Sequence, residues 1–183
     1  MRQPEVKGDA GPGAVFRRGA ARGMVAGAVG VVVMTLAEKV EQRLTGRPDS
    51  EVPARTLQRV LGRRDDPARR WLMNPVMHFG QAVMLGSLRG IMAEAGLRGP
   101  WSSAMFTVVR LTNDQTLENA TGIGAPPWTW PRKELAVDLI HKAIYGFTTG
   151  AVADRLSAAS GPGPGGRHAQ IRPGRHEDVG PRP

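Results

Sequence analysis

The chain has 183 residues, of which 40% are hydrophobic and only 5% aromatic, and its 25 Lys and Arg outnumber its 16 Asp and Glu to give a net charge of +9. The length suits a single domain, and the lack of cysteine excludes a disulfide scaffold, a thiolate metal site and a cysteine nucleophile. A charge this high is typical of proteins that bind nucleic acid or acidic membranes, so its position along the chain matters.

Residues 1–22 and 159–183 have the composition of disordered segments. The last 25 residues hold eleven Gly or Pro and lack Leu, Phe, Met and Trp, so they bury too little apolar surface to offset the entropy of ordering them. These two ends carry five of the nine net positive charges. We therefore expect a helical domain over residues 23–158 with disordered basic tails on both sides. The domain carries a charge of +4, of which +3 lies in the loop 45–75, so its helical segments are nearly neutral.

Four helical segments are predicted in that domain, and none of its stretches has the sustained alternation of a β-strand. The first, residues 23–44, contains fourteen uncharged residues from Met24 to Ala37, which suits either a buried soluble helix or a short membrane span. A linker follows, and its amphipathic stretch 54–61 suits packing on the domain or lying on a membrane surface. The other predicted helices are residues 74–96, 100–119 and 134–156.

Proline and glycine mark the ends of these segments. Pro75 suits the first turn of the second helix, and Gly96 suits its C-terminal cap. Between the third and fourth helices, the sequence TGIGAPPWTWPRK (121–133) predicts a rigid loop that no helix can cross.

Three of the segments carry glycines four residues apart, a spacing that places both on one helix face. Glycine inside a soluble helix costs about 1 kcal/mol relative to alanine, whereas in membranes small residues let two helices approach closely. We therefore predict that these glycines form helix–helix contacts, with chance occurrence as the alternative. The pairs are Gly23 with Gly27, Gly86 with Gly90, and Gly146 with Gly150.

The fourth segment has two distinct faces. Ile140 and Phe147 belong to an apolar face, and Asp138, His141 and Tyr145 belong to a polar face on the opposite side. A soluble bundle would turn the apolar face inward, whereas a membrane bundle would turn the polar face toward its neighbouring helices. Periodicity alone leaves both arrangements open.

Several motifs along residues 23–156 together resemble one family. They are Ala37-Glu38 at the end of the first helix, the Gly46-Arg47-Pro48 turn, His78, the stretch from Gly122 to Trp128 (GIGAPPW), and His141. In this order they resemble the YagU-like family of small bacterial inner-membrane proteins, which are thought to span the membrane several times and lack a defined biochemical activity. The resemblance implies an integral protein of the cytoplasmic membrane.

The most concentrated polar cluster lies in the third segment, where Arg110, Asp114 and Glu118 share one helix face. One interpretation is a solvated helix end with a salt bridge. Inside a bilayer, however, ionisable side chains are costly, face the bundle interior and usually mark function. In that case His78 is a candidate to converge with Glu118.

Asp138 and His141 are candidates for the same polar core. Their spacing occurs in carboxylate-bridged metal bundles, but those sites usually need two such motifs and this chain has one, so we predict no metal. A proton-responsive pair of a histidine and a carboxylate is favoured over a metal site, because histidine titrates near neutral pH. A purely structural histidine is favoured over both.

Trp128 and Trp130 precede two basic residues, as at membrane–water interfaces, although they also suit a loop packed on the bundle end. The arginines between positions 63 and 70 suggest contact with anionic phospholipid or nucleic acid. Because Asp65 and Asp66 interrupt them, nucleic acid is disfavoured as a partner.

The sequence contains no phosphate-binding loop, dinucleotide fingerprint or nucleophile elbow, which argues against an enzyme, and no cofactor is predicted. We expect an all-α, four-helix membrane-type bundle with a structural or transport-like role, and a proton-responsive polar core is left open beside the favoured structural one. Its expected partner is the lipid bilayer, with a homo-oligomer left open. The alternative is a soluble or peripheral all-α protein that binds a partner protein or an acidic surface.

Overall fold

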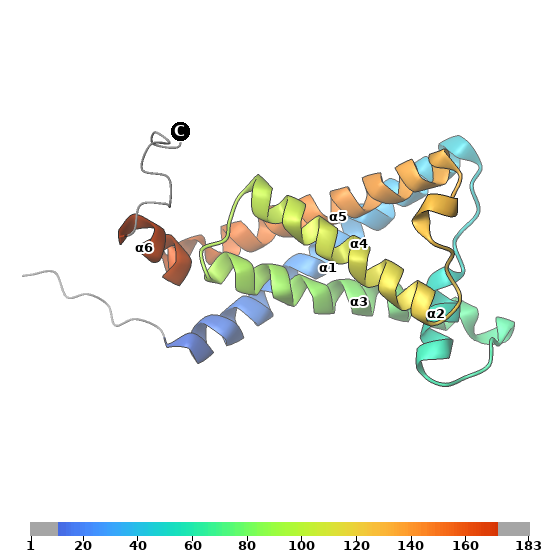
Figure 1. Cartoon of the computed structure of the whole chain (residues 1–183), viewed down its shortest axis with the longest axis horizontal. Helices are drawn as coiled ribbons and strands as arrows, with labels where there is room; N and C mark the ends of the chain where they lie inside the picture. Colours follow the sequence, from blue (N-terminus) through green and yellow to red (C-terminus); the bar gives the residue numbers. More distant parts are fainter. Residues whose placement is uncertain (1–10, 172–183) are drawn as a thin grey trace, which may run out of the picture.

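The computed structural model describes residues 11–171, and within this range the chain forms helices and turns without a β-strand. The predicted all-α class is therefore confirmed. The long helices lie alongside one another, with the short helix α2 at one end and α6 at the other (Figure 1). The α-helices are α1 (Pro12–Thr45), α2 (Val52–Val60), α3 (Arg70–Glu94), α4 (Pro100–Ala120), α5 (Arg132–Ser157) and α6 (Gly163–Ile171), and 3-10 turns occur at Pro67–Arg69, Pro127–Thr129 and Ala158–Ser160.

Helix α1 packs against α3 and α5, and α4 packs against α5. Helices α1 and α3 are antiparallel, because Gly19 faces Ile91 while Gly27 faces Ala82. The predicted glycine pair of α5 contacts α4, where Gly146 lies against the side chain of Thr107.

All six predicted glycines lie at helix–helix contacts. A Cβ added at Gly27 would lie 2.6 Å from the Ala82 carbonyl oxygen, and one at Gly86 would lie 2.6 Å from the Gly27 Cα. At the next level of the same interface, a Cβ at Gly23 would meet the backbone of Gly86 and Ser87, and one at Gly90 would meet the backbone of Gly19 and Gly23. Real Cβ atoms do not come this close to backbone, so the α1–α3 interface requires glycine.

The N-terminal boundary differs from the prediction, since residues 12–22 are helical and not disordered. Pro12 occupies the first helical turn, and Gly19 lies against the backbone of Ile91. Arg22 then forms an ion pair with the buried carboxylate of Glu94. These contacts with α3 are distant in sequence and hold a segment whose local composition favours disorder. Residues 1–10 of the predicted tail lie outside the described residues.

The C-terminal boundary also differs, because α6 is helical within the segment predicted as a disordered tail. The Gly165 amide donates a hydrogen bond of 2.7 Å to the Ala95 carbonyl oxygen at the end of α3. Arg98 reinforces this end by donating to the carbonyl oxygens of Ser157 and Gly161. Positions 172–183 of the predicted tail lie outside the described residues.

Helix α3 begins four residues earlier than predicted, and Pro75 lies inside it. The Asp66 carboxylate accepts a hydrogen bond from the Ala68 amide and starts a 3-10 turn that continues directly into α3. Gly96 ends this helix region in a left-handed conformation with φ 101°, as its position in the sequence predicted.

The bundle interior is partly polar. Small apolar clusters form around Phe106 and Tyr145 and around Ala26 and Ala153. Fully buried polar side chains accompany them: Gln58, Arg89, Glu94, Thr149 and Ser157. Large apolar side chains stand exposed on the outside of the helices, among them Val25, Val29, Val32, Met84, Leu88, Met105, Val108 and Phe147.

Within the described residues, α1 is the one helix long and apolar enough to cross a membrane by length and composition. The core helix of a soluble protein meets the same criterion, and so does a signal sequence. Composition alone therefore does not support membrane crossing by the other long helices.

Candidate functional site

A polar cavity of about 380 Å³ lies at the end of the bundle near α2. Helices α1 to α5 all contribute to its lining, together with the loop before α5. All six residues predicted for the polar core line this one cavity: His78, Arg110, Asp114, Glu118, Asp138 and His141.

Asp114 is the centre of a buried charge network in the cavity wall. Its carboxylate accepts a hydrogen bond of 2.9 Å from Arg110 Nε and lies 3.5 Å from Lys142 Nζ. Gln81 of α3 donates a further hydrogen bond of 2.9 Å to the same carboxylate. Arg110, Asp114 and Lys142 are all buried, so α3, α4 and α5 are joined here by charged groups removed from solvent.

Lys142 also forms an ion pair with Asp138, one helical turn before it. Asp138 therefore pairs with its i,i+4 neighbour Lys142, in place of the expected partner His141. Lys142 was not among the predicted site residues, although its i,i+4 spacing from Asp138 indicates such a pair. No group of three or more His, Cys, Asp or Glu suited to a metal ion occurs among the described residues.

Arg110 connects the charge network to the aromatic core. Its guanidinium carbon lies 5.1 Å from the centre of the Tyr145 ring, and Tyr145 donates a hydrogen bond of 2.6 Å to the Ala82 carbonyl oxygen. Arg110 Nη1 is buried and has no hydrogen-bond partner among the described residues. The hydroxyl of Thr56 in α2, which also lines the cavity, is likewise buried and has no hydrogen-bond partner among the described residues.

Glu118 stands at the far end of α4 and forms no ion pair with any described residue. Burial raises the pKa of its carboxyl group from 4.5 to about 7, and the nearby charge of Asp114 adds to this while Lys142 opposes it.

The loop after α4 is shaped around Glu118. The amides of Ile123 and Gly124 each donate a hydrogen bond of 3.0 Å to the Glu118 carbonyl oxygen. A Cβ at Gly124 would lie 2.6 Å from the Glu118 Cβ, so only glycine leaves room for this side chain. Further along the loop, Trp130 lines the cavity and donates a hydrogen bond of 2.7 Å to the Ala125 carbonyl oxygen. Trp128, in contrast, is 84% exposed.

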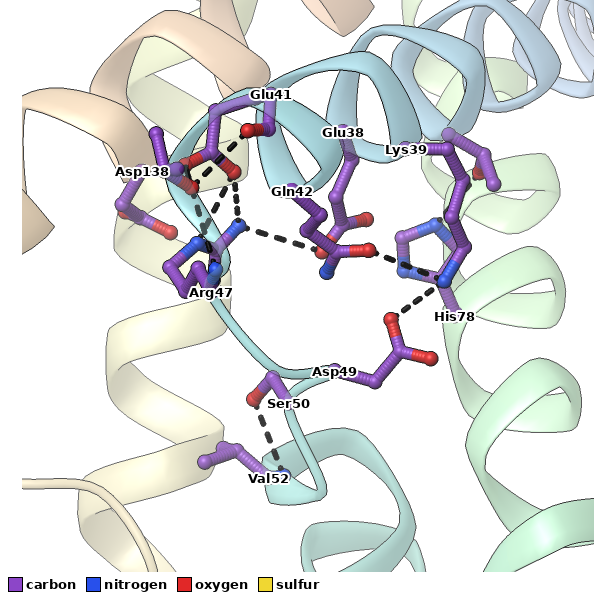
Figure 2. Close-up of polar contacts among 12 residues, drawn as sticks. Glu38, Lys39, Glu41, Gln42, Arg47, Asp49, Ser50, Val52, His78 and Asp138 are labelled. Carbon is purple, nitrogen blue, oxygen red and sulfur yellow. Dashed lines mark hydrogen bonds and ion pairs between the residues drawn. The ribbon is translucent and has the colours of Figure 1, made fainter.

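The turn after α1 brings a third cation to the cavity (Figure 2). Gly46 ends α1 in a left-handed conformation with φ 72°, and Arg47 folds back toward the helix. Arg47 donates hydrogen bonds of 3.0 and 2.9 Å to Glu41 and lies 3.7 Å from the carboxylate of Glu38. The hydrogen bond from Arg47 lowers the pKa of Glu41.

His78 and His141 face the cavity from different helices. His78 Nε2 lies 3.1 Å from the Thr35 hydroxyl of α1, which links α1 and α3 at this level. Every motif on which the family resemblance rests thus contributes to the cavity wall: Glu38, Arg47, His78, the loop at Ile123 to Ala125, and His141. Glu38 and Arg47 were predicted only as parts of that resemblance and not as site residues.

A second buried charge network lies at the opposite end of the bundle, and the sequence analysis missed it. Arg89, which is fully buried, donates a hydrogen bond of 2.8 Å to Asp154 of α5. Asp154 also accepts one of 2.8 Å from the Gly99 amide before α4. Asp154 thus connects α5 with α3 and with the start of α4, and the Asp114 network connects the same three helices at the cavity end.

No protein-family model, curated protein or solved structure matches this chain. The resemblance to the YagU-like family therefore stays a prediction that rests on the quoted motifs.

Proposed function

We propose that this chain is an integral membrane protein in which α1, α3, α4 and α5 form a four-helix bundle with a transport-like role, and that the polar cavity is its proton-responsive site. The supporting observation is the distribution of side chains, with charged and polar groups buried beside small apolar clusters and many large apolar groups exposed on the outside. This is the arrangement expected of helices that pack in lipid.

Helix α5 carries this observation most clearly. Ile140 is 57% exposed and Phe147 is 45% exposed, whereas Tyr145 on the opposite face is fully buried. Exposing the apolar face costs free energy in water, about 25 cal/mol per Å² of surface, and costs nothing against lipid tails. The exposure of Ile140 and Phe147 and the burial of Tyr145 therefore support the membrane arrangement of the two that periodicity left open.

The apolar outer surface forms a belt between two charged levels. One level is marked by Arg22 with its partner Glu94, and the other by Glu38. The sixteen residue-to-residue steps from Arg22 to Glu38 span about 24 Å of helix, which is shorter than the roughly 30 Å of a bilayer's hydrocarbon core. A span this short is accommodated by local thinning or by snorkelling of flanking charges.

Charged and aromatic residues follow the pattern expected of such a belt. Arg89, within it, is buried and paired with Asp154 and does not face outward. Exposed tryptophans stand beyond it, Trp101 at the start of α4 and Trp71 at the start of α3. Tryptophan prefers the membrane–water interface, so these two side chains suit opposite interfaces. The cavity, including Glu118, lies at the edge of the belt and beyond it, where water has access.

The second candidate is a peripheral or soluble helical protein whose outer apolar surface binds a partner protein. The observation that favours it is that α1 is the only described helix with the length and composition of a membrane span. In that case the exposed apolar side chains would be covered by protein in place of lipid.

Alkaline carbonate washing of membranes from cells that produce the full chain separates the two candidates. We expect the protein to stay in the membrane pellet after the wash and to require detergent for release. Release into the carbonate supernatant would contradict the integral membrane proposal and support the peripheral one.

A further inference from the structure

We propose that the polar cavity binds a small primary-amine cation that also carries an oxygen acceptor, and that binding displaces a proton from Glu118. This inference rests on the cavity of the proposed function and adds the chemical class of its ligand.

The charges in the cavity lining favour a cation. Five carboxylates line it and three Lys or Arg side chains do so, an excess of two negative charges when the carboxylates are ionised. The cations are paired with Asp114, Asp138 and Glu38. The other two carboxylates, those of Glu118 and Glu134, form no ion pair with a described residue. An entering cation would therefore be stabilised beside the unpaired carboxylate of Glu118 in α4.

Two buried polar groups call for an oxygen acceptor on the same ligand. Arg110 Nη1 and the Thr56 hydroxyl both belong to cavity-lining residues, and both are buried without a partner among the described residues. Burying a donor without a partner costs roughly 1–3 kcal/mol, and more when the group is charged. A ligand hydroxyl or carbonyl oxygen would satisfy such a donor.

The size and composition of the cavity favour an organic cation over a metal ion. Its volume of about 380 Å³ is at the lower end of the range for small-molecule sites, roughly 300–1,000 Å³. The described part of the chain offers no cluster of three His or carboxylate ligands. An alkylammonium group needs only one or two carboxylates, which this wall provides.

Exchange with a proton keeps the charge of the cavity constant. The Glu118 carboxyl group releases its proton to water, and the ammonium group of the ligand takes its place as the positive charge beside the carboxylate. The nearby charges of Asp114, Arg110, Asp138 and Lys142 act directly on Glu118. The other charged or titratable groups that line the cavity with it are Glu38 of α1, Arg47 after α1, His78 of α3, and Glu134 and His141 of α5.

Isothermal titration calorimetry on the purified full chain in detergent micelles tests the ligand class with three compounds of equal chain length. We expect 4-amino-1-butanol to bind, butylamine to bind roughly tenfold more weakly because it lacks the oxygen, and butyrate not to bind. Butyrate binding as tightly as 4-amino-1-butanol would overturn the proposal, and so would a failure of both amines to bind.

The pH dependence of binding tests the exchange. Below pH 7 we expect the affinity for 4-amino-1-butanol to rise about tenfold per pH unit, with a plateau above pH 7. Glu118→Gln should remove this pH dependence, whereas the control Glu51→Gln, an exposed carboxylate outside the cavity, should retain it. A Glu118→Gln protein that still releases one proton per amine bound would contradict the assignment.

Thr56→Val provides a second variant that leaves the charges unchanged. It should weaken binding of 4-amino-1-butanol toward the level of butylamine and leave butylamine binding unaltered. An equal loss for both compounds would mean that Thr56 does not contact the ligand oxygen. Because binding is measured on purified protein, a negative result counts against this inference alone, and release by carbonate counts against membrane integration alone.

Discussion

Asp114 holds two buried cations, Arg110 and Lys142, that come from different helices. A buried charge is tolerated when its partner is present, and it becomes strongly destabilising when that partner is removed. The sequence showed Arg110 and Asp114 as neighbours on one helix face, which suits an exposed pair equally well. Their burial follows from the approach of α5, which brings Lys142 to the same carboxylate.

Asp114→Ala should therefore destabilise the fold strongly. We expect a loss of about 3–5 kcal/mol in the free energy of unfolding, because two cations are left buried without compensation. The matched control is Asp49→Ala, which removes a carboxylate from an exposed pair with Lys39 and should cost at most about 1 kcal/mol. Chemical denaturation in micelles measures both, and equal losses would show that Asp114 is solvated.

Because Glu118 is buried, we expect the stability of the fold to fall as the pH rises. Its pKa is about 7 in the folded chain and 4.5 as the ordinary value, so between these values the folded state binds more protons than the unfolded state. The contribution of Glu118 to stability is thus complete below pH 4.5 and is lost as the pH rises to about 7. Thermal unfolding from pH 4.5 to 8 should show this decline in the unmodified chain, and Glu118→Gln should lessen it. An unchanged profile in the variant would contradict the burial of this carboxyl group.

At the scale of the helices, close backbone contact decides the fold. Glycine spacing predicted the contacts of α1 with α3 and of α5 with α4, because four-residue spacing keeps small residues on one face. The partners opposite those glycines were not predictable in the same way. Thr107 and Ser103 of α4 face Gly146 and Gly150, and nothing local in the sequence selects them.

Gly86 and Gly80 offer a matched test within α3. Gly86→Ala should destabilise the bundle, because the added Cβ would lie 2.6 Å from the Gly27 Cα and force α1 and α3 apart. Gly80→Ala should stabilise it by about 0.5–1 kcal/mol, since nothing lies within 4 Å and alanine favours the helix. Thermal unfolding of both variants should give shifts of opposite sign, and shifts of the same sign would argue against close packing.

The ends of the helices show what local signals decide. Pro100, Gly46 and Gly96 mark boundaries that the structure shares, because proline and glycine act through their own backbone. The early start of α1 was missed because residues 12–22 are held by α3 through Gly19 and Arg22, and such distant contacts leave no local pattern.

For the molecule as a whole, substitutions on the apolar outer surface test whether that surface faces lipid or water, because the two cases predict opposite results. Met84 is 73% exposed near the middle of α3. If this surface faces lipid, Met84→Lys should lower the amount of protein inserted in membranes, because a lysine at the centre of a membrane helix costs about 2.5–3.5 kcal/mol.

The control for this test is Leu44→Lys, at an equally exposed position beyond Glu38 near the end of α1. It should leave insertion unchanged, because a lysine there reaches water. If the outer surface faces water, Met84→Lys should instead be neutral or improve solubility. Quantitative immunoblotting of carbonate-washed membranes distinguishes these outcomes.

The sequence by itself determined that the chain is helical, that glycines four residues apart share a helix face, and that Arg110, Asp114 and Glu118 lie on one side of their helix, because these properties depend on local backbone preference and on spacing along one helix. The packing of α3, α4 and α5 decided that His78, Asp138 and His141 line the same cavity as those three residues. Only the tertiary structure decided that the polar faces point inward, since helical periodicity is the same for a bundle and for its inside-out counterpart. It also decided that Lys142 and Arg47 complete the cavity, because ion pairs between helices depend on how those helices pack. The net charge of +9 likewise gains its meaning from the fold, in which the buried charges are paired and much of the excess lies at the two ends of the chain.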